Sequence, residues 1–177
     1  RPRLWFVIAP GCMDSMVNKY TAARRLRSED AYSPDGRHDL RPEYPTIVYT
    51  QILKKLYPDV PVVLGGIEAS MRRLMHYDYW KERFMPSILS LSGADLITYG
   101  MGEQATREIT RRMLHAIEQY DDTLFYDDDG EPCITTATFR RFVSLTNPVP
   151  QTTALYDKEE IPQGIAEDDI VLHSYDE

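Results

Sequence analysis

The chain has 177 residues, of which 42% are apolar and 27% charged, so its length and composition predict about one globular domain with an ordinary core. The formal net charge is −8, which argues against bulk binding to nucleic acid, because that binding draws its affinity from cations on phosphates. The longest clean apolar run, residues 4–9, is far shorter than the roughly 20 residues of a membrane span. Two cysteines, Cys12 and Cys133, form no disulfide framework, so we expect a cytoplasmic protein.

Charge is unevenly distributed along the chain. Residues 1–90 carry 14 Lys or Arg and 10 Asp or Glu, a net +4, whereas residues 91–177 carry 6 and 18, a net −12. We interpret the acidic half as a solvated surface that keeps the protein soluble. The basic excess of the first half lies beside the glycines described below.

Three short segments predict buried parallel strands: residues 4–9, 60–64 and 96–99. Each is rich in β-branched or aromatic residues and apolar on both faces, as a strand covered by helices on both sides requires. Residues 45–56 and 103–120 place apolar side chains along one helical stripe, as amphipathic helices do. Strands that alternate with helices predict an α/β fold with a parallel sheet.

The first of these strands would leave an unpaired sheet edge. Three parallel strands make a thin sheet for 177 residues, since open sheets of this class usually have about five or six. The strand at residues 4–9 begins within a few residues of Arg1 and has no predicted neighbour on one side. We therefore expect a fragment whose missing N-terminal residues supply the remaining strands. The alternative is that another chain covers this edge.

The segments between the strands are less regular. Residues 14–27 predict a helix with Asp14 or Ser15 as N-cap and arginines in its last turn. Residues 28–44 predict a long polar loop, of the kind that forms lids, binding loops or mobile segments. Residues 68–75 predict a further helix, and it is followed by an aromatic cluster of Tyr77, Tyr79, Trp80 and Phe84.

The C-terminal part predicts small elements only. Residues 124–136 contain Asp-Gly between apolar residues, which is typical of a β-hairpin, and residues 140–145 predict a short strand. From residue 148 onward, proline, threonine and acidic residues predict an extended tail that wraps the domain or links it to another.

The glycines that follow the three predicted strands indicate a ligand-facing edge. Because parallel strands end on the same side, these turns converge where open α/β sheets bind ligands, and helix N-termini there attract anions. The alternative is that the glycines only make tight turns between strand and helix. Together with neighbouring polar residues they give these candidates for a ligand site or an interdomain surface: Gly11, Asp14, Ser15, Gly65, Gly66, Glu68, Ser70, Arg72, Arg73, His76, Gly100, Gly102 and Glu103.

Three of these candidates also have an ordinary structural interpretation. Arg72 and Arg73 could clamp a carboxylate or phosphate through their guanidinium forks, or could pair with Glu68 and Asp78. His76 could be a general base oriented by a carboxylate, or a packed and hydrogen-bonded residue among aromatic side chains.

No metal site is predicted in this chain. The four histidines are widely separated, and two cysteines cannot supply a full ligand set for an iron–sulfur cluster. The acidic run at residues 127–130 lacks the alternation of a calcium loop, so a solvated turn is the better interpretation.

Long stretches of the sequence resemble the YgiQ-type radical SAM proteins, in the domain that precedes their radical SAM barrel. These stretches agree in order and spacing and include MDSMVNKYTA, RRLR, VPVVLGGIEAS and HYDYW. The resemblance covers residues 4–115 and returns at residues 168–177. The Gly-Gly turn after the second strand and the Ala-Asp-x-x-x-x-Gly-x-Gly-Glu motif at residues 94–103 resemble cobalamin-binding-like domains, which are flavodoxin-like.

This resemblance implies a fold and a division of the chain. Residues 1–120 would form a partial flavodoxin-like or Rossmann-like three-layer sandwich, with its first two strands upstream of Arg1. Residues 121–177 would form an extension and linker toward the barrel. The Asp-x-His-x-x-Gly motif, whose histidine ligates cobalt in some cobalamin domains, is absent from the sequence, which argues against bound cobalamin.

The resemblance also implies the cofactors of the parent protein. A Cys-x-x-x-Cys-x-x-Cys motif downstream would hold a [4Fe–4S] cluster, and S-adenosylmethionine bound to it would give a radical that takes hydrogen from an unidentified substrate. This domain would shape or cap the substrate site without catalysis of its own. Two alternatives are a module that binds an anionic small molecule, a nucleotide or a corrinoid, and a docking domain whose Tyr77, Tyr79 and Trp80 contact the barrel.

Overall fold

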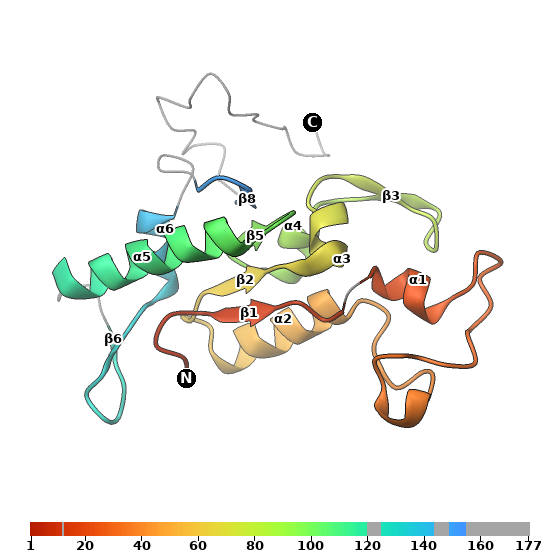
Figure 1. Ribbon diagram of the computed structural model, residues 1–177, viewed down its shortest axis with the longest axis horizontal. Coiled ribbons are helices and arrows are strands. Elements are labelled where there is room, and N and C mark those ends of the chain that lie inside the picture. The colour runs from red at the N-terminus through yellow and green to blue at the C-terminus, as the bar shows by residue number, and fades with distance from the viewer. Residues whose placement is uncertain (12, 120–124, 144–148, 155–177) are drawn as a thin grey trace, which may run out of the picture.

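A computed structural model describes residues 1–11, 13–119, 125–143 and 149–154 (Figure 1). At its centre lies a four-stranded sheet in the order β1-β2-β5-β8. Three strands are parallel and lie within the predicted segments, whereas the fourth, which the sequence did not predict, pairs antiparallel with β5. The strands are β1 (Phe6–Ile8), β2 (Val62–Leu64), β5 (Leu96–Thr98) and β8 (Thr152–Thr153).

Helices cover both faces of this sheet, which confirms the predicted α/β fold with a partial Rossmann-like layout. Figure 1 shows α2 and α5 on opposite sides of the strands. Alternate strand residues supply the two cores: Val63 and Leu96 pack with α5 and α6, whereas Val62, Leu64 and Ile97 pack with α2 and α4. The helices are α2 (Pro45–Leu56), α4 (Ile88–Ser92), α5 (Glu103–Gln119) and α6 (Thr136–Phe142).

The two long helices follow from their sequence patterns as predicted. α2 begins at Pro45, whose missing N–H is no loss in a first helical turn. α5 buries Ala105, Ile109 and Met113 at the intervals of four that predicted it. Within the described residues, none of the helices has the length and apolar character needed to cross a membrane.

The helix predicted over residues 14–27 is wrong beyond its first turns. α1 (Ser15–Lys19) begins as predicted, because the side chain of Asp14 accepts a hydrogen bond from a backbone N–H of the first turn, but it ends at Tyr20. The chain then bends, with Arg24 in the left-handed region at φ 56°. Arg27 donates to the backbone oxygens of Val17 and Tyr20, so this arginine, one of those that suggested a helix end, instead closes the bend.

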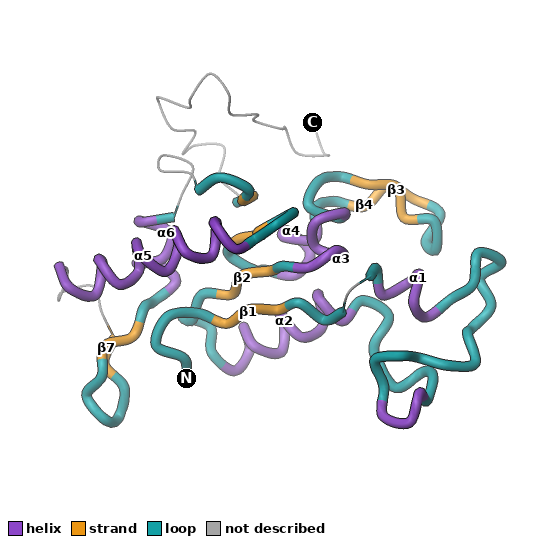
Figure 2. The backbone as a smooth tube through the Cα atoms, viewed as in Figure 1, coloured by secondary structure: helices purple, strands orange, loops and turns teal. Residues whose placement is uncertain are grey.

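The predicted polar loop between α1 and α2 has its own buried anchor. Figure 2 shows this loop extending beyond α1, with the short helix η1 (Pro34–Gly36) inside it. Asp30 in the loop is 5% exposed and accepts a hydrogen bond from Arg41 Nε at 2.8 Å. Burial raises the pKa of Asp30, but the bonds from Arg41 and from the backbone N–H of Tyr32 outweigh it and lower this pKa to about 2.

Three further elements differ from prediction in length or kind. α3 (Gly66–Met71) is shorter than the predicted helix, and the aromatic cluster after it forms an antiparallel hairpin of β3 (His76–Asp78) and β4 (Arg83–Met85). Residues 140–142, predicted as part of a strand, belong to α6. Thr135 caps that helix, and Phe139 and Val143 bury one helical face in the core.

The remaining C-terminal predictions are tested only in part. The hairpin is confirmed where the structure describes it, since β6 (Phe125–Tyr126) pairs antiparallel with β7 (Pro132–Cys133). Cys12, residue 124, the tail from residue 155 and the segment 168–177 lie outside the described residues. The division of the chain near residue 120 and the two strands upstream of β1 stay predictions.

A buried ion-pair cluster joins the helices at the amino end of the sheet. The side chain of Asp95 is fully buried just before β5. Its Oδ2 accepts from Lys54 Nζ at 2.6 Å and from the backbone N–H of Val62 at 2.8 Å, and its Oδ1 accepts from Arg140 Nη2 at 3.0 Å. This carboxylate therefore links α2, β2 and α6.

We expect Asp95→Ala to lower the free energy of unfolding by about 3–5 kcal/mol, because it leaves a partly buried ammonium and a strand N–H without their partner. Urea unfolding followed by circular dichroism measures this loss. Glu108→Ala is the matched control, because Glu108 pairs with Arg111 and Arg112 on the surface of α5 and should matter much less. Equal losses in the two variants would contradict a central role for Asp95.

Candidate functional site

The glycine turns after β1, β2 and β5 meet at the carboxyl edge of the sheet. A methyl group at Gly66 would lie 3.5 Å from the backbone oxygen of Gly11, and Gly66 has a φ of +83°, so a larger residue would be strained there. Methyl groups at Gly65 and Gly102 would both lie near the Thr98 hydroxyl oxygen, at 3.4 and 3.7 Å. The three turns predicted to converge are thus in contact with one another.

Arg72 is the centre of a buried ion-pair cluster beside these turns. Its Nε and Nη2 donate to the two carboxylate oxygens of Asp14 at 2.7 and 3.2 Å, and its Nη1 donates to Asp78 Oδ2 at 3.0 Å. All three residues are at most 8% exposed. The guanidinium therefore joins the start of α1, the end of α3 and the end of β3. Of the two interpretations given above for Arg72, the structure shows the pairing with Asp78, while its other carboxylate partner is Asp14 and not Glu68.

The ring of Tyr44 and the charges around it complete this cluster. The Tyr44 hydroxyl donates to Asp78 Oδ2 at 2.8 Å, and its ring lies under Arg72 and Lys81, with Lys81 Nζ 4.5 Å from the ring centre. Burial raises the pKa of Asp78, but hydrogen bonds from the Lys81 backbone N–H, Tyr44 and Arg72 bring it below its ordinary value. Burial lowers the pKa of Arg72, but its bonds to Asp14 and Asp78 outweigh burial and raise this pKa above its ordinary value, so the guanidinium is charged at neutral pH.

Glu68 is a buried carboxyl group whose hydrogen bonds favour a bound proton. It is 2% exposed and contacts the hydroxyls of Ser15 and Thr46. The Ser15 hydroxyl has one hydrogen, but it lies 2.5 Å from Glu68 Oε1 and 2.8 Å from the backbone oxygen of Glu43, which can only accept. If Ser15 is the donor in both contacts, its one hydrogen is shared between two acceptors, whereas a proton on Glu68 that is donated to Ser15 gives each contact a hydrogen of its own.

Burial agrees with a proton on Glu68. Burial raises the pKa of Glu68 more than the contacts with Ser15 and Thr46 lower it, while the charge of Asp14 raises this pKa and the charge of Arg72 lowers it. We infer that Glu68 is a neutral carboxylic acid that fastens α1 and the start of α2 to α3.

His76 is held by the same cluster and has no free ring nitrogen. Its Nε2 lies 3.2 Å from Arg72 Nη1, and its Nδ1 lies 3.1 Å from the backbone oxygen of Leu74. Because a guanidinium only donates and a carbonyl only accepts, each ring nitrogen already has a hydrogen-bond partner within the chain. His76 thus matches the packed and hydrogen-bonded interpretation.

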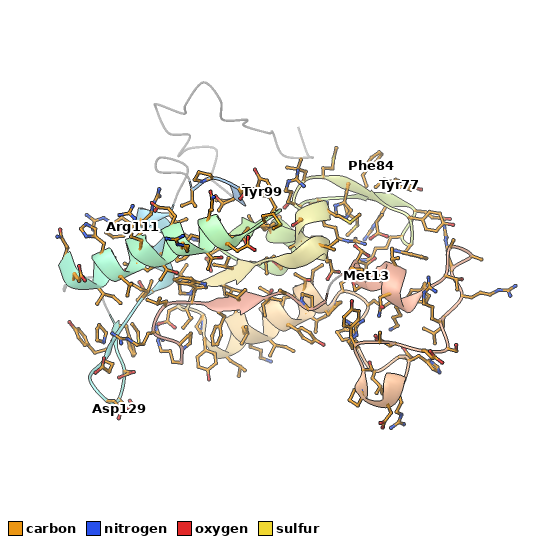
Figure 3. The ribbon with its side chains drawn as sticks, in the orientation of Figure 1. Met13, Tyr77, Phe84, Tyr99, Arg111 and Asp129 are labelled. Carbon is orange, nitrogen blue, oxygen red and sulfur yellow. The ribbon has the colours of Figure 1, made fainter. Side chains whose placement is uncertain are left out.

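The other predicted residues lie outside this cluster. The Arg73 guanidinium stacks over the ring of Tyr99 at 4.7 Å, where Figure 3 labels that ring near the end of β5. The Ser70 hydroxyl donates to the backbone oxygen of Gly66, and Glu103 is exposed in the first turn of α5. The structure therefore brings together Asp14, Ser15, Glu68, Arg72 and His76, but not Ser70, Arg73, Gly100 or Glu103.

A cavity of about 440 Å³ opens beside the cluster, between α2, α4 and the β3–β4 hairpin. The larger part of its wall is apolar, and one end is formed by the charged cluster. The lining residues are Glu43, Tyr44, Ile47, Val48, Gln51, Arg72, His76, Asp78, Lys81, Met85, Ile88 and Leu91.

Sequence reasoning missed Tyr44 and Thr46, since nothing in the order of residues along the chain connects the start of α2 with the end of α3.

The described residues do not fit a metal ion or an iron–sulfur cluster. In the part of the chain that the structure describes, no three His, Cys, Asp or Glu side chains are grouped to hold a metal. Cys133 is buried in β7, where its Sγ lies 3.7 Å from the backbone oxygen of Glu131.

We expect Arg72→Met to lower the free energy of unfolding by about 3–5 kcal/mol, because it leaves the carboxylates of Asp14 and Asp78 buried and unpaired. Arg73→Met is the control from the next position, since Arg73 lies on a ring and touches no carboxylate in the described contacts. Urea unfolding measures both losses. Variants of equal stability would show that the cluster does not hold the edge together.

Glu68→Gln tests the proton on Glu68. A raised pKa means that the folded chain holds a proton that the unfolded chain releases, so the free energy of unfolding falls as the pH rises above about 4.3, until the folded carboxyl itself ionises. Glutamine keeps both hydrogen bonds without this proton, so the variant should lose that pH dependence and be at least as stable as the parent near pH 7.

Chemical unfolding between pH 4 and pH 8 measures this effect, with exposed Glu103→Gln as the control. A loss of stability at neutral pH as large as that of Glu68→Ala would show that Glu68 is ionised.

Comparison with known proteins identifies the family. The family described as Radical SAM N-terminal matches residues 1–176. A UPF0313 protein of Bacteroides thetaiotaomicron is 54% identical over 177 residues, which are 100% of this chain and 26% of the relative. UPF0313 proteins of Porphyromonas gingivalis and Geobacter sulfurreducens are 66% and 56% identical over 121 and 113 residues, covering 68% and 64% of this chain and 19% of each relative. No solved structure matches. The chain spans about a quarter of the length of the first relative, and it belongs to the Radical SAM N-terminal family, as the resemblance implied.

Proposed function

We propose that this domain caps the substrate site of a radical SAM enzyme, in which the rest of the polypeptide binds a [4Fe–4S] cluster and S-adenosylmethionine. Family membership supports the enzyme class, and the relatives are several times longer than this chain. The reduced cluster would supply the electron that cleaves S-adenosylmethionine into methionine and the 5′-deoxyadenosyl radical. The proposal keeps residues 1–120 as the α/β domain and 121–177 as an extension toward the barrel, with no cobalamin assigned, in a cytoplasmic protein.

One observation carries the role as a cap. At the carboxyl edge of the sheet, the buried charged side chains are bonded to one another: Arg72 bonds to Asp14 and Asp78, and Glu68 is buried beside them. Such an edge has little charge left for an ionic ligand and little freedom to move. These are the properties of a fixed wall over a reaction site rather than of a catalytic group.

A second candidate function rests on the cavity between α2, α4 and the hairpin. Its volume of about 440 Å³ lies in the range of small-molecule sites, and apolar walls with one polar end are typical of them. Arg72 is already neutralised there, so an anion would depend on Lys81 alone. We therefore rank a ligand-binding module below the cap.

The test uses the full-length protein, reconstituted anaerobically with iron and sulfide. Arg72→Lys keeps the positive charge but loses the two parallel bonds to Asp14, and so loosens the edge. We expect unchanged iron content and a faster formation of 5′-deoxyadenosine from S-adenosylmethionine without substrate, because reductant and solvent reach a poorly covered site.

Arg111→Lys, on the exposed surface of α5, is the control and should behave like the parent. Rates that do not differ between Arg72→Lys and the parent would contradict the cap. A full-length parent that binds no iron–sulfur cluster would remove the enzyme class as well.

A further inference from the structure

Large apolar side chains are exposed on α3 and the hairpin that follows it. Met71 is 63% exposed and Met75 is 53% exposed, although methionine is usually a core residue. We call the following six residues the α3 surface: Ile67, Met71, Leu74, Met75, Tyr77 and Phe84, each at least 40% exposed.

Local geometry brings the side chains of the α3 surface together in two pairs. Ile67 and Met71 are four residues apart in α3 and so lie on one face of that helix. Tyr77 and Phe84 pair directly across the hairpin, with ring centres 5.5 Å apart, and Figure 3 labels them next to each other on it. Met101, in the turn after β5, is 73% exposed and adds a further apolar side chain at the same edge of the sheet.

A surface of this kind has a partner whose chemistry can be stated. Contiguous exposed apolar side chains cost free energy in water and mark contacts with another surface. Thioether side chains adapt their shape to that surface. Arg72 pairs with two carboxylates and Arg73 lies on Tyr99, so neither cation is free beside this surface. Arg83 is exposed in the hairpin, but it precedes Phe84 in β4 and so lies on the opposite face of that strand. An apolar partner therefore fits the α3 surface best.

We propose that the α3 surface is the contact through which this domain docks on the radical SAM part of its own polypeptide. The inference rests on the proposed function in taking that part to follow in the same chain. In the relative that matches the whole chain, this domain is only 26% of the length, so a large covalently attached surface is available at high effective concentration. The α3 surface also adjoins the glycine turns, where a cap must face the site that it covers.

Carbene labelling of the full-length protein under anaerobic conditions tests this contact. A photoactivated diazirine labels side chains that solvent reaches, and mass spectrometry locates the label. We expect Met71 and Met75 to be labelled as little as Met113, which is 0% exposed in the core. Leu56 on α2 and Leu114 on α5, which are 64% and 47% exposed, are the matched controls and should be labelled strongly.

Labelling of Met71 and Met75 at the level of Leu56 and Leu114 would overturn the proposal. Protection that disappears on dilution would also overturn it, because a second copy would then be the partner. The double variant Met71→Asp with Met75→Asp places two carboxylates in the contact. Both positions are exposed in the domain itself, so the domain should stay folded while the contact is lost. We therefore expect strong labelling of Leu74 in this variant. The two proposals can fail separately. If Met71 and Met75 stay protected in the parent while Arg72→Lys leaves 5′-deoxyadenosine formation unchanged, the interface is supported and only the cap is contradicted.

Discussion

The buried guanidinium of Arg72 is the constraint on which the carboxyl edge of this sheet depends. A cation 8% exposed is stable in a protein only if carboxylates surround it, and here Asp14 and Asp78 do so from two other segments. The start of α1, 58 residues away in the sequence, is thereby fixed to the end of α3 and to the hairpin that follows it.

The same constraint explains the neutral state of Glu68. Arg72 is one cation beside two carboxyl groups, Asp14 and Asp78, and an ionised Glu68 next to Asp14 would add repulsion in a buried region. A protonated Glu68 avoids this and links Ser15 to Thr46 across α1, α2 and α3. Repulsion and hydrogen counting therefore favour the same state, and the edge becomes a rigid surface whose buried charges are paired, with the apolar side chains of α3 beside it.

Local patterns predicted the parts of the fold that local interactions determine. The strands were visible because they are apolar on both faces, and α5 was visible because Ile109 and Met113 repeat at helical spacing. Where contacts distant in sequence decide, prediction was wrong or silent. Arg27 closes a bend instead of a helix, the two-residue strand β8 exists only through its pairing with β5, and α6 was mistaken for a strand because its stripe begins at Phe139, before the segment considered.

For the site, the glycine turns and most of the cluster could be predicted, because the end of each parallel strand is known once the strands are. The partners could not, since Tyr44 and Thr46 approach Asp78 and Glu68 only through the packing of α2.

The most direct test of the central constraint is a mutant cycle that combines Arg72→Met with Asp14→Asn and Asp78→Asn. If buried charge balance holds the edge, the combined variant should recover part of the unfolding free energy lost in Arg72→Met alone. Losses that simply add would contradict it.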